Sequence, residues 1–380
     1  MNPQRQKPRP SEAASKAIRP LTPKREPRAP VLLPAAPRAV EFLYLDQDAM
    51  VAADILDMHR AMDVVGQAQS LFSRGEVRQP HKVVLRNEET PESEDRHGRF
   101  NGLAASITGP DPCMGMKWIG SFPSNRKRGM PRASALIILN CPKTGFPLAV
   151  MDGTLINAMR TGAMTGLGAH YLAPRVTRKI GIIGSGVQSR TQILGLYTEL
   201  PEVEEIALFG RNAAAAEEVA EDCRQRWGAP VRTASTIGEA LTDADIALTI
   251  TTAGEPLMLA RHIKPGALTV QLAGHECEFA LVRQCAKIVT DDWDTVKHRG
   301  IMTPAIMHQQ GLLRDEDIYA KLGDLILGRK PGRQSDEERI HYCHMGMGLD
   351  DVALAWSVYQ TASERNLGVR MPLWREPLWV

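Results

Sequence analysis

Two patterns of apolar residues divide the chain. From Val40 to about residue 153, apolar runs such as HKVVLR, GLAASITG, GMKWIGSF, ASALIILNC and PLAVMDG alternate with turns that contain Gly or Pro. Such runs predict short strands of a mixed, β-rich region. An amphipathic helix is expected before them, because five apolar residues recur near helical spacing. These are Ile55, Met58, Met62, Val65 and Leu71.

The pattern changes at Lys179 to alternating strands and helices. The apolar run KIGIIGSG precedes the helical VQSRTQILGLYTEL, and EIALFG precedes NAAAAEEVAEDCRQRWG. DIALTITT, GALTVQLAG and KIVTDDW supply further strand-like runs. Repeats of this kind build a parallel, doubly wound sheet with right-handed crossovers. After about residue 310 the pattern is helical, as in DDVALAWSVYQTASERNLG, and we expect this tail to return to the first region.

The predicted fold class is therefore α/β, a Rossmann-type doubly wound parallel sheet plus a mixed α+β domain formed from both chain ends. The boundaries that follow are 40–165 and 311–380 for the mixed domain and 166–310 for the Rossmann domain. Two domains also suit 380 residues, a length too great for one ordinary core.

The first 39 residues do not fit either pattern. Residues 1–38 hold nine Lys or Arg, nine Pro and only two acidic residues, Glu12 and Glu26. A segment of this composition buries too little apolar surface to offset its ordering entropy, so we expect a disordered basic arm over 1–39. A tail without a dedicated role and a docking arm for an acidic partner both remain open. A transit peptide is disfavoured, because proline breaks the amphipathic helix that it requires.

The remaining composition is that of a soluble globular protein, 43% apolar and 24% charged. The net charge of +2 predicts no strong attraction to nucleic acid or to an anionic membrane. No apolar run of about 20 residues and no signal peptide are seen, so a cytoplasmic protein is expected. Six scattered cysteines without a C-x-x-C pair argue for reduced thiols. His341, Cys343 and His344 lack a carboxylate at matching spacing, so we expect no metal site.

The segment Gly184-Ser185-Gly186-Val187-Gln188-Ser189 is the strongest chemical motif. It reads G-x-G-x-x-S, one serine away from the dinucleotide fingerprint, and it joins a predicted strand to a predicted helix. The first glycine permits a tight turn, and the second lets the backbone approach a pyrophosphate at the helix N-terminus. Serine, in third place, is small and can donate to a phosphate. We expect a nicotinamide dinucleotide here.

The end of the next predicted strand indicates which dinucleotide. In EIALFGRN, Arg211 stands where NAD-binding proteins carry an acidic residue for the ribose hydroxyls. A guanidinium can hold a 2′-phosphate in a bidentate way, and Asn212 can add a hydrogen bond. NADP(H) is therefore favoured. NAD(H) remains possible, because an arginine that only stacks on adenine suits both cofactors.

Several segments together resemble the ornithine cyclodeaminase/mu-crystallin family. RTGAMTGLGAHYLAP and IGIIGSGVQSRTQ carry the family resemblance. QPHKVVLR, GMKWIGSFPSN, TDDWDTVKHRG, YAKLGDLILGRKPGR and MGMGLDDVALA resemble its branch of N-(2-amino-2-carboxyethyl)-L-glutamate dehydrogenases. The resemblance spans about residues 42 to 373. It implies a homodimer joined through the substrate domains, and a nicotinamide cofactor that oxidises α-amino acids or reduces imines.

The resemblance also implies site residues. Lys117 matches a lysine that contacts the substrate carboxylate and the reacting centre, and Arg160 matches an arginine that also binds the carboxylate. Lys82 matches another substrate cation, with His81 and Arg86 as alternatives at that place. Thr161 is expected against the cofactor phosphates, and Thr251 and Thr252 are also expected at the cofactor.

These residue types suit the chemistry without the family. Hydride transfer needs the α-carbon held about 3 to 3.5 Å from the nicotinamide, which two cations on one carboxylate can achieve. Without the family, a lysine beside Trp118 would more often lie at the surface with its stem on an apolar face.

The turn LAGHECEF is the last candidate, since it follows an apolar run of the Rossmann region and should face the cleft. Cyclodeaminases carry Gly-Gly-Asp at the matching place, whereas this chain has Gly274-His275-Glu276. We expect His275 to act as a general acid on an imine or amine nitrogen, with Glu276 holding the imidazole or the substrate ammonium. A solvated turn is the alternative.

Three functions remain open at this point. The first is an NAD(P)-dependent oxidoreductase acting on the C–N bond of an α-amino or α-imino acid, and it is the one we favour. The second is an ornithine or lysine cyclodeaminase with catalytic NAD, which lacks its aspartate here. The third is a non-enzymatic protein that binds NADPH, against which Lys117 and Arg160 count.

Overall fold

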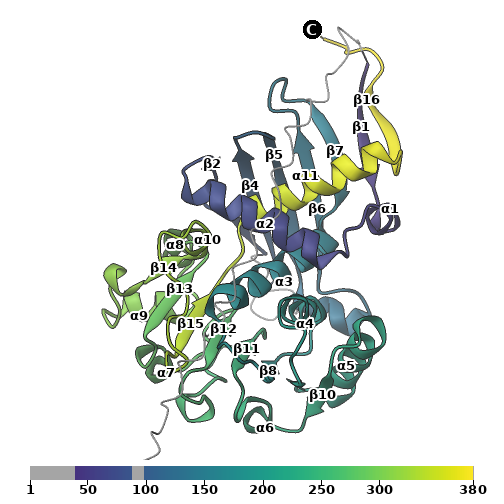
Figure 1. Cartoon of the computed structure of the whole chain (residues 1–380). Coiled ribbons are helices and arrows are strands. Elements are labelled where there is room, and N and C mark those ends of the chain that lie inside the picture. The colour runs from purple at the N-terminus through teal and green to yellow at the C-terminus, as the bar shows by residue number, and fades with distance from the viewer. Residues whose placement is uncertain (1–38, 88–97, 380) are drawn as a thin grey trace, which may run out of the picture.

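A computed structural model of the chain describes residues 39–87 and 98–379. Except for Ala39, the predicted basic arm lies outside the described residues. The chain forms two eight-stranded sheets, each with its own helices, as Figure 1 shows.

The first sheet is mixed and contains both ends of the described chain. Its path runs β16-β1-β7-β6-β5-β4-β2, with β3 also paired to β4. Only β1 and β7 are parallel; the other neighbours are antiparallel. The strands are β1 (Val40–Leu45), β2 (Val77–Arg78), β3 (Val83–Arg86), β4 (Arg99–Ile107), β5 (Cys113–Ser121), β6 (Ala133–Asn140), β7 (Pro147–Asp152) and β16 (Val369–Trp374). A 3-10 turn, η1 (Pro123–Arg128), follows β5.

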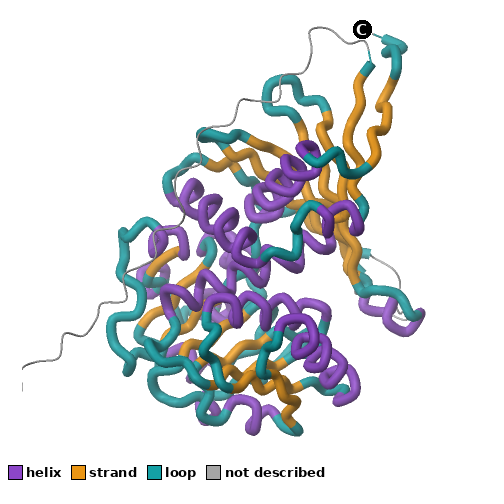
Figure 2. The backbone as a smooth tube through the Cα atoms, turned by 45° about the vertical axis from the view of Figure 1, so that its right-hand side comes forward, coloured by secondary structure: helices purple, strands orange, loops and turns teal. Residues whose placement is uncertain are grey.

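Helices cover one face of this sheet. They are α2 (Met58–Ser73), α3 (Gly153–Leu172) and α11 (Gly348–Glu364), with the short α1 (Gln47–Ala52) beside β1 (Figures 1 and 2). The expected amphipathic helix is interrupted, because Asp54 has φ 63° and Asp57 caps α2 by accepting a hydrogen bond from Arg60 N. Ile55 therefore lies between two helices, although it is buried as its spacing predicts.

The second sheet is parallel throughout and confirms the doubly wound prediction. Its order is β10-β9-β8-β11-β12-β15-β13-β14. The strands are β8 (Lys179–Ile183), β9 (Glu205–Phe209), β10 (Val231–Ala234), β11 (Ile246–Thr249), β12 (Leu268–Gln271), β13 (Lys287–Thr290), β14 (Ala320–Lys321) and β15 (Ile340–Cys343). The helices are α4 (Val187–Glu199), α5 (Ala213–Trp227), α6 (Ile237–Leu241), α7 (Phe279–Arg283), α8 (Trp293–Arg299), α9 (Thr303–Gln309) and α10 (Leu322–Ile326), and the 3-10 turns are η2 (Ala260–His262) and η3 (Asp315–Asp317).

Both predicted domain boundaries need correction. β14 and β15 belong to the second sheet, and β15 lies between β12 and β13, so the chain returns to the first sheet only at α11 and not at residue 311. The helical pattern of this stretch hid a four-residue strand that is buried throughout. The boundary at 165/166 falls inside α3, which is one continuous helix.

Helix α3 joins the two halves. It packs on α2 and β6 of the first half and along α4 of the second. The backbones of α3 and α4 touch at two glycines: a Cβ on Gly195 would collide with Gly162 O, and one on Gly162 with Thr191 O. Apolar side chains of both sheets and of α3 form one continuous core. Within the described ranges, none of the helices has the length and hydropathy of a membrane span.

Candidate active site

The predicted dinucleotide loop joins β8 to the N-terminus of α4. Gly184 has φ 121°, and a Cβ there would collide with Ile250 O, so the first glycine is required by the turn. Gly186 is the N-cap of α4 and has no side-chain cap, which leaves the helix amides of this end without that partner. A Cβ on Gly186 would meet only Arg126, with Nη2 at 3.8 Å. The loop therefore has the geometry of an anion site.

The other loop residues have different surroundings. Ser185 packs against Gly210, because a Cβ placed on Gly210 would collide with the Ser185 hydroxyl. Val187 is exposed, and Gln188 carries a buried Oε1 that has no hydrogen-bond partner among the described residues. Ser189 corrects one expectation: it is fully buried and donates to Gly184 O at 2.5 Å, so it stabilises the turn and is not available to a phosphate.

Arg211 and Asn212 follow β9, next to this loop in the sheet order. Arg211 is exposed. Asn212 caps α5, since its side chain accepts from Ala215 N at 3.2 Å. Its Oδ1 is thus engaged in the helix cap. Of these two residues, Arg211 has the side chain that is exposed to a ligand.

Lys117 and Arg160 are brought together by Asp351, which lies in the first turn of α11. Lys117 Nζ lies 2.5 Å from Asp351 Oδ2, and Arg160 Nε lies 3.0 Å from Asp351 Oδ1. Asn157 Oδ1 accepts from Lys117 Nζ at 2.9 Å and from Arg160 Nη2 at 2.7 Å. The three charged residues are buried, with Lys117 1% and Asp351 0% exposed. β5, α3 and the N-terminus of α11 each supply part of this cluster.

One guanidinium nitrogen of the cluster remains unused. Arg160 Nη1 is buried and has no hydrogen-bond partner in the described chain. Gly346, with φ 77°, leaves the space that the guanidinium occupies, because a Cβ there would collide with it. Burial lowers the pKa of Lys117 to about 8, with Asp351 opposing the shift. The arrangement suits a carboxylate ligand, which could accept from the free Arg160 nitrogen.

A second acid lies one residue before Asp351. Asp350 is fully buried and accepts from Gln69 Nε2 at 2.7 Å, and burial raises its pKa to about 7. Asp350 therefore joins the start of α11 to Gln69 of α2, while Asp351 contacts Lys117 and Arg160. The sequence shows two neighbouring acids at the start of this helix. Only the packing of the fold shows that Asp350 contacts Gln69, whereas Asp351 contacts Lys117 and Arg160.

Lys82 lies near this cluster and Arg86 is farther out. Burial, helped by the nearby charges of Arg299, Lys117 and Arg160 and opposed by Asp291, lowers the pKa of Lys82 to about 7. Arg86 is exposed on β3 and acts on the pKa values of Arg99 and Arg299. Lys82, and not Arg86, therefore lies close to the Lys117 and Arg160 cluster.

Glu276 was expected to hold the imidazole of His275 or the substrate ammonium, but its Oε1 contacts Thr251. Glu276 is fully buried, and its Oε1 accepts from Thr251 N at 2.7 Å and from the Thr251 hydroxyl at 2.5 Å. It holds the loop after β11 and does not hold the imidazole of His275. Thr252 is exposed in that loop, whereas Thr161 is buried and donates its hydroxyl to Asn157 O.

His275 lies in the turn after β12. Its ring packs 5.1 Å from that of Phe279, and its Nε2 is buried with no partner among the described residues. Burial lowers its pKa, which favours the neutral imidazole. A neutral ring can accept a proton during oxidation of an amine, and the same group returns it during reduction of an imine. His275 belongs to none of the contacts that join Lys117, Arg160 and Asp351.

The two histidines in and directly after β15 are buried, and each contacts a threonine hydroxyl. His341 Nδ1 and the Thr269 hydroxyl are 2.9 Å apart, and His344 Nε2 lies 2.9 Å from the Thr165 hydroxyl. Burial lowers their pKa values to about 4 and about 3 respectively, so both rings are neutral. Across residues 39–87 and 98–379, no group of three His, Cys, Asp or Glu is arranged to hold a metal.

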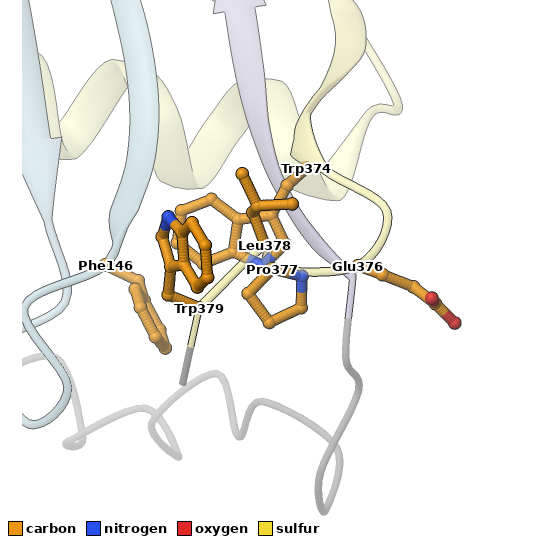
Figure 3. Close-up of a pocket in the computed structure, with 6 residues that line it drawn as sticks. All are labelled: Phe146, Trp374, Glu376, Pro377, Leu378 and Trp379. Carbon is orange, nitrogen blue, oxygen red and sulfur yellow. The ribbon is translucent and has the colours of Figure 1, made fainter.

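An apolar hollow of about 630 Å³ lies away from this cluster (Figure 3). It is formed at the C-terminal end of β16 by Phe146, Trp374, Glu376, Pro377, Leu378 and Trp379. None of these side chains belongs to the dinucleotide loop or to the Lys117 cluster. The hollow is a surface feature at one edge of the first sheet.

The geometry can be compared with known proteins. The sequence pattern of the ornithine cyclodeaminase/mu-crystallin family matches residues 44–366. The N-((2S)-2-amino-2-carboxyethyl)-L-glutamate dehydrogenase of Staphylococcus aureus is 29% identical over 336 residues, covering 88% of this chain and 99% of that protein.

Two solved structures are also similar. The Δ1-pyrroline-2-carboxylate reductase of Thermococcus litoralis, in complex with NADH and L-proline, gives a TM-score of 0.79 at 28% identity, covering 86% of this chain and 99% of the other. An archaeal alanine dehydrogenase dimer with bound NAD gives 0.78 at 30% identity, covering 88% and 100%. A match over most of the chain, on the fold and the motifs described above, means that the protein belongs to the ornithine cyclodeaminase/mu-crystallin family.

Proposed function

We propose that the protein is an NAD(P)-dependent oxidoreductase that acts on the C–N bond of an α-amino or α-imino acid. The observation that carries the proposal is the buried pair Lys117 and Arg160, fixed by Asp351 and Asn157 and left with one unused guanidinium nitrogen. Its relatives support the same class, since they include amino-acid dehydrogenases and an imine reductase.

A bound nicotinamide would exchange a hydride with the α-carbon of the substrate. Gly184, Gly186 and the start of α4 would hold its diphosphate. Arg160 would bind the substrate carboxylate through Nη1, and Asp351 keeps the guanidinium in place. Lys117 would hold or release a proton at its Nζ, because a pKa of about 8 makes both protonation states accessible. His275 Nε2 would accept the proton from the substrate nitrogen during oxidation.

A cyclodeaminase is the weaker alternative. That reaction relies on an aspartate where this chain has His275, and the neighbouring carboxylate of Glu276 is bound to Thr251. The turn thus has no aspartate at the position that this reaction uses, and one oxygen of the Glu276 carboxylate is already engaged.

The proposal is tested by following the absorbance of reduced nicotinamide with α-amino acids, and with α-keto acids plus amines. Lys117→Met and His275→Ala should each lower turnover by about 10²-fold or more, the scale for a lost acid or base. Lys143→Met, an exposed lysine before β7, should leave turnover unchanged. Full turnover in Lys117→Met would contradict the proposal. Ammonia release from ornithine without net change in nicotinamide would indicate a cyclodeaminase.

We further propose NADP(H) as the preferred cofactor, supported by exposed Arg211 at the end of β9. Arg211→Asp should weaken NADPH binding by about 1.5 to 3 kcal/mol, the value of a charge-assisted hydrogen bond, and leave NADH binding nearly unchanged. Arg283→Asp, an exposed arginine of α7, is the control. Equal affinities for the two cofactors in the wild type and in Arg211→Asp would refute the preference.

We also propose a homodimer joined through the first sheet. The face opposite the helices exposes apolar side chains from neighbouring strands, among them Phe100, Leu136 and Ile138. An apolar face of this extent is typical of an interface between subunits. The archaeal relative with bound NAD is a dimer.

We place the enzyme in the cytoplasm, a proposal supported by six free cysteines.

A further inference from the structure

A row of cationic side chains leads away from the Lys117 cluster. Arg99 stands at the start of β4, four residues before Leu103, which pairs with Lys117 of β5. Side chains on a strand alternate between faces, so Arg99 and Leu103 share a face, and this is the face on which Lys117 points. Arg99 therefore lies on the inner face of the first sheet, beyond Lys117.

The second domain contributes Arg299 to the same row. The rings of His81 and His298 stack with centroids 4.0 Å apart, which joins the start of β3 to the end of α8. The residues that follow, Lys82 and Arg299, are thereby neighbours across the two halves. Arg299 lowers the pKa of Lys82, and Arg99 in turn lowers the pKa of Arg299, in addition to the larger effect of burial.

Arg132 continues the row towards the dinucleotide loop. It precedes β6, and its carbonyl accepts from Phe122 N at the other end of the η1 loop. Burial lowers the pKa of Arg132, and Arg99 and Arg126 add to the shift. Arg126 Nη2 would lie 3.8 Å from a Cβ placed on Gly186. The row thus begins at the reaction centre with Lys82, passes through Arg299, Arg99 and Arg132, and ends at Arg126 beside the predicted diphosphate site.

These arginines have no counter-charge in the described part of the chain. No ion pair there involves Arg99, Arg132 or Arg299, whereas surface arginines such as Arg224 and Arg232 each contact two glutamates. The Nε atoms of Arg99 and Arg132 are buried and unpartnered, as is Asn101 Oδ1 on the same face of β4. The acid beside Lys82 is Asp291, and its carboxylate already accepts from the backbone amides of Asp292, Met345 and Gly346.

Partly buried cations without partners are costly unless a ligand supplies the charge. We propose that Arg99 and Arg299, with Arg132 behind them, bind a second carboxylate of the substrate, so that the natural substrate is an acidic α-amino or α-imino acid. This inference rests on the proposed function, because Arg160 and Lys117 take the first carboxylate. Arg126 is assigned to the cofactor diphosphate, since it lies at the Gly186 end of the row.

Two α-keto acids of equal chain length test the inference as analogues of the imino acid. 2-Oxoglutarate carries a distal carboxylate and 2-oxovalerate does not. Their affinities are measured by calorimetry on the full chain loaded with reduced cofactor. The wild type should bind 2-oxoglutarate about tenfold or more tightly, the size of one charge-assisted hydrogen bond. Arg99→Gln and Arg299→Gln should each remove most of this preference, without changing the affinity for 2-oxovalerate or for the cofactor.

Arg283→Gln, the exposed arginine of α7, is the matched control and should keep the preference. Equal binding of the two keto acids by the wild type would overturn the inference and leave the proposed function standing. A preference that survives in both Arg99→Gln and Arg299→Gln would also overturn it, as would a loss of cofactor affinity in these variants. If neither keto acid bound, the proposed function would fail, and the inference with it.

Discussion

Lys82 and Lys117 should set the pH dependence of substrate binding. Burial lowers their pKa values to about 7 and about 8, so each is a cation below that pH and becomes neutral above it. Under the proposed function these cations bind a substrate carboxylate, so its affinity should fall as pH rises through 7 and then 8. Calorimetric titration of a keto acid across this range measures the fall. Lys82→Arg stays protonated and should remove the step near 7 while keeping the step near 8; an unchanged profile in this variant would exclude Lys82 from binding.

At the level of elements, the contact between α3 and α4 should govern both stability and turnover. Gly195→Ala would push α4 against the Gly162 carbonyl. Overpacking of this kind costs about 1 to 3 kcal/mol, and the shift of α3 should displace Arg160 and lower turnover. Denaturant unfolding and steady-state kinetics measure the two effects. Gly238→Ala in α6, where a Cβ would meet only Thr236 at 3.9 Å, should be neutral or slightly stabilising. Equal stability of the two variants would show that the helices can separate freely.

For the whole molecule, the folded body should not depend on the basic arm. A segment with nine prolines and nine Lys or Arg in its first 38 residues adds little core, so deleting residues 1–38 should leave the melting temperature and turnover nearly unchanged. Because the apolar face of the first sheet lies within the remaining chain, the shortened protein should still sediment as a dimer. A large drop in melting temperature, or a monomer, would show that the arm packs on the body or bridges the subunits.

Local pattern in the sequence was sufficient for many of the elements and for the turn that carries the glycine-rich loop. Strand and helix periods arise from neighbours in the chain, so β4 to β7 and the alternation from β8 to β12 could be predicted. Gly184 and Arg160 could be named because each lies in a motif whose residues are consecutive in the chain: Gly184 in the glycine-rich turn and Arg160 in the family motif. The partners of Lys117 could not, because Asp351 is 234 residues away and reaches it only when α11 packs on β5.

What the tertiary structure alone decided is where distant segments meet. The sequence placed the C-terminal tail with the first domain from residue 311, but β15 inserts between β12 and β13, since a short buried strand is stabilised by its neighbours in the sheet and not by its own pattern. The sequence did not reveal that one carboxylate oxygen of Glu276 accepts from Thr251, 25 residues earlier in the chain. Arg99 and Arg299 belong to different halves of the chain, and only the packing of those halves brings them close enough for Arg99 to lower the pKa of Arg299, in addition to the larger effect of burial. Charge and burial depend on these long-range contacts, which local periodicity does not record.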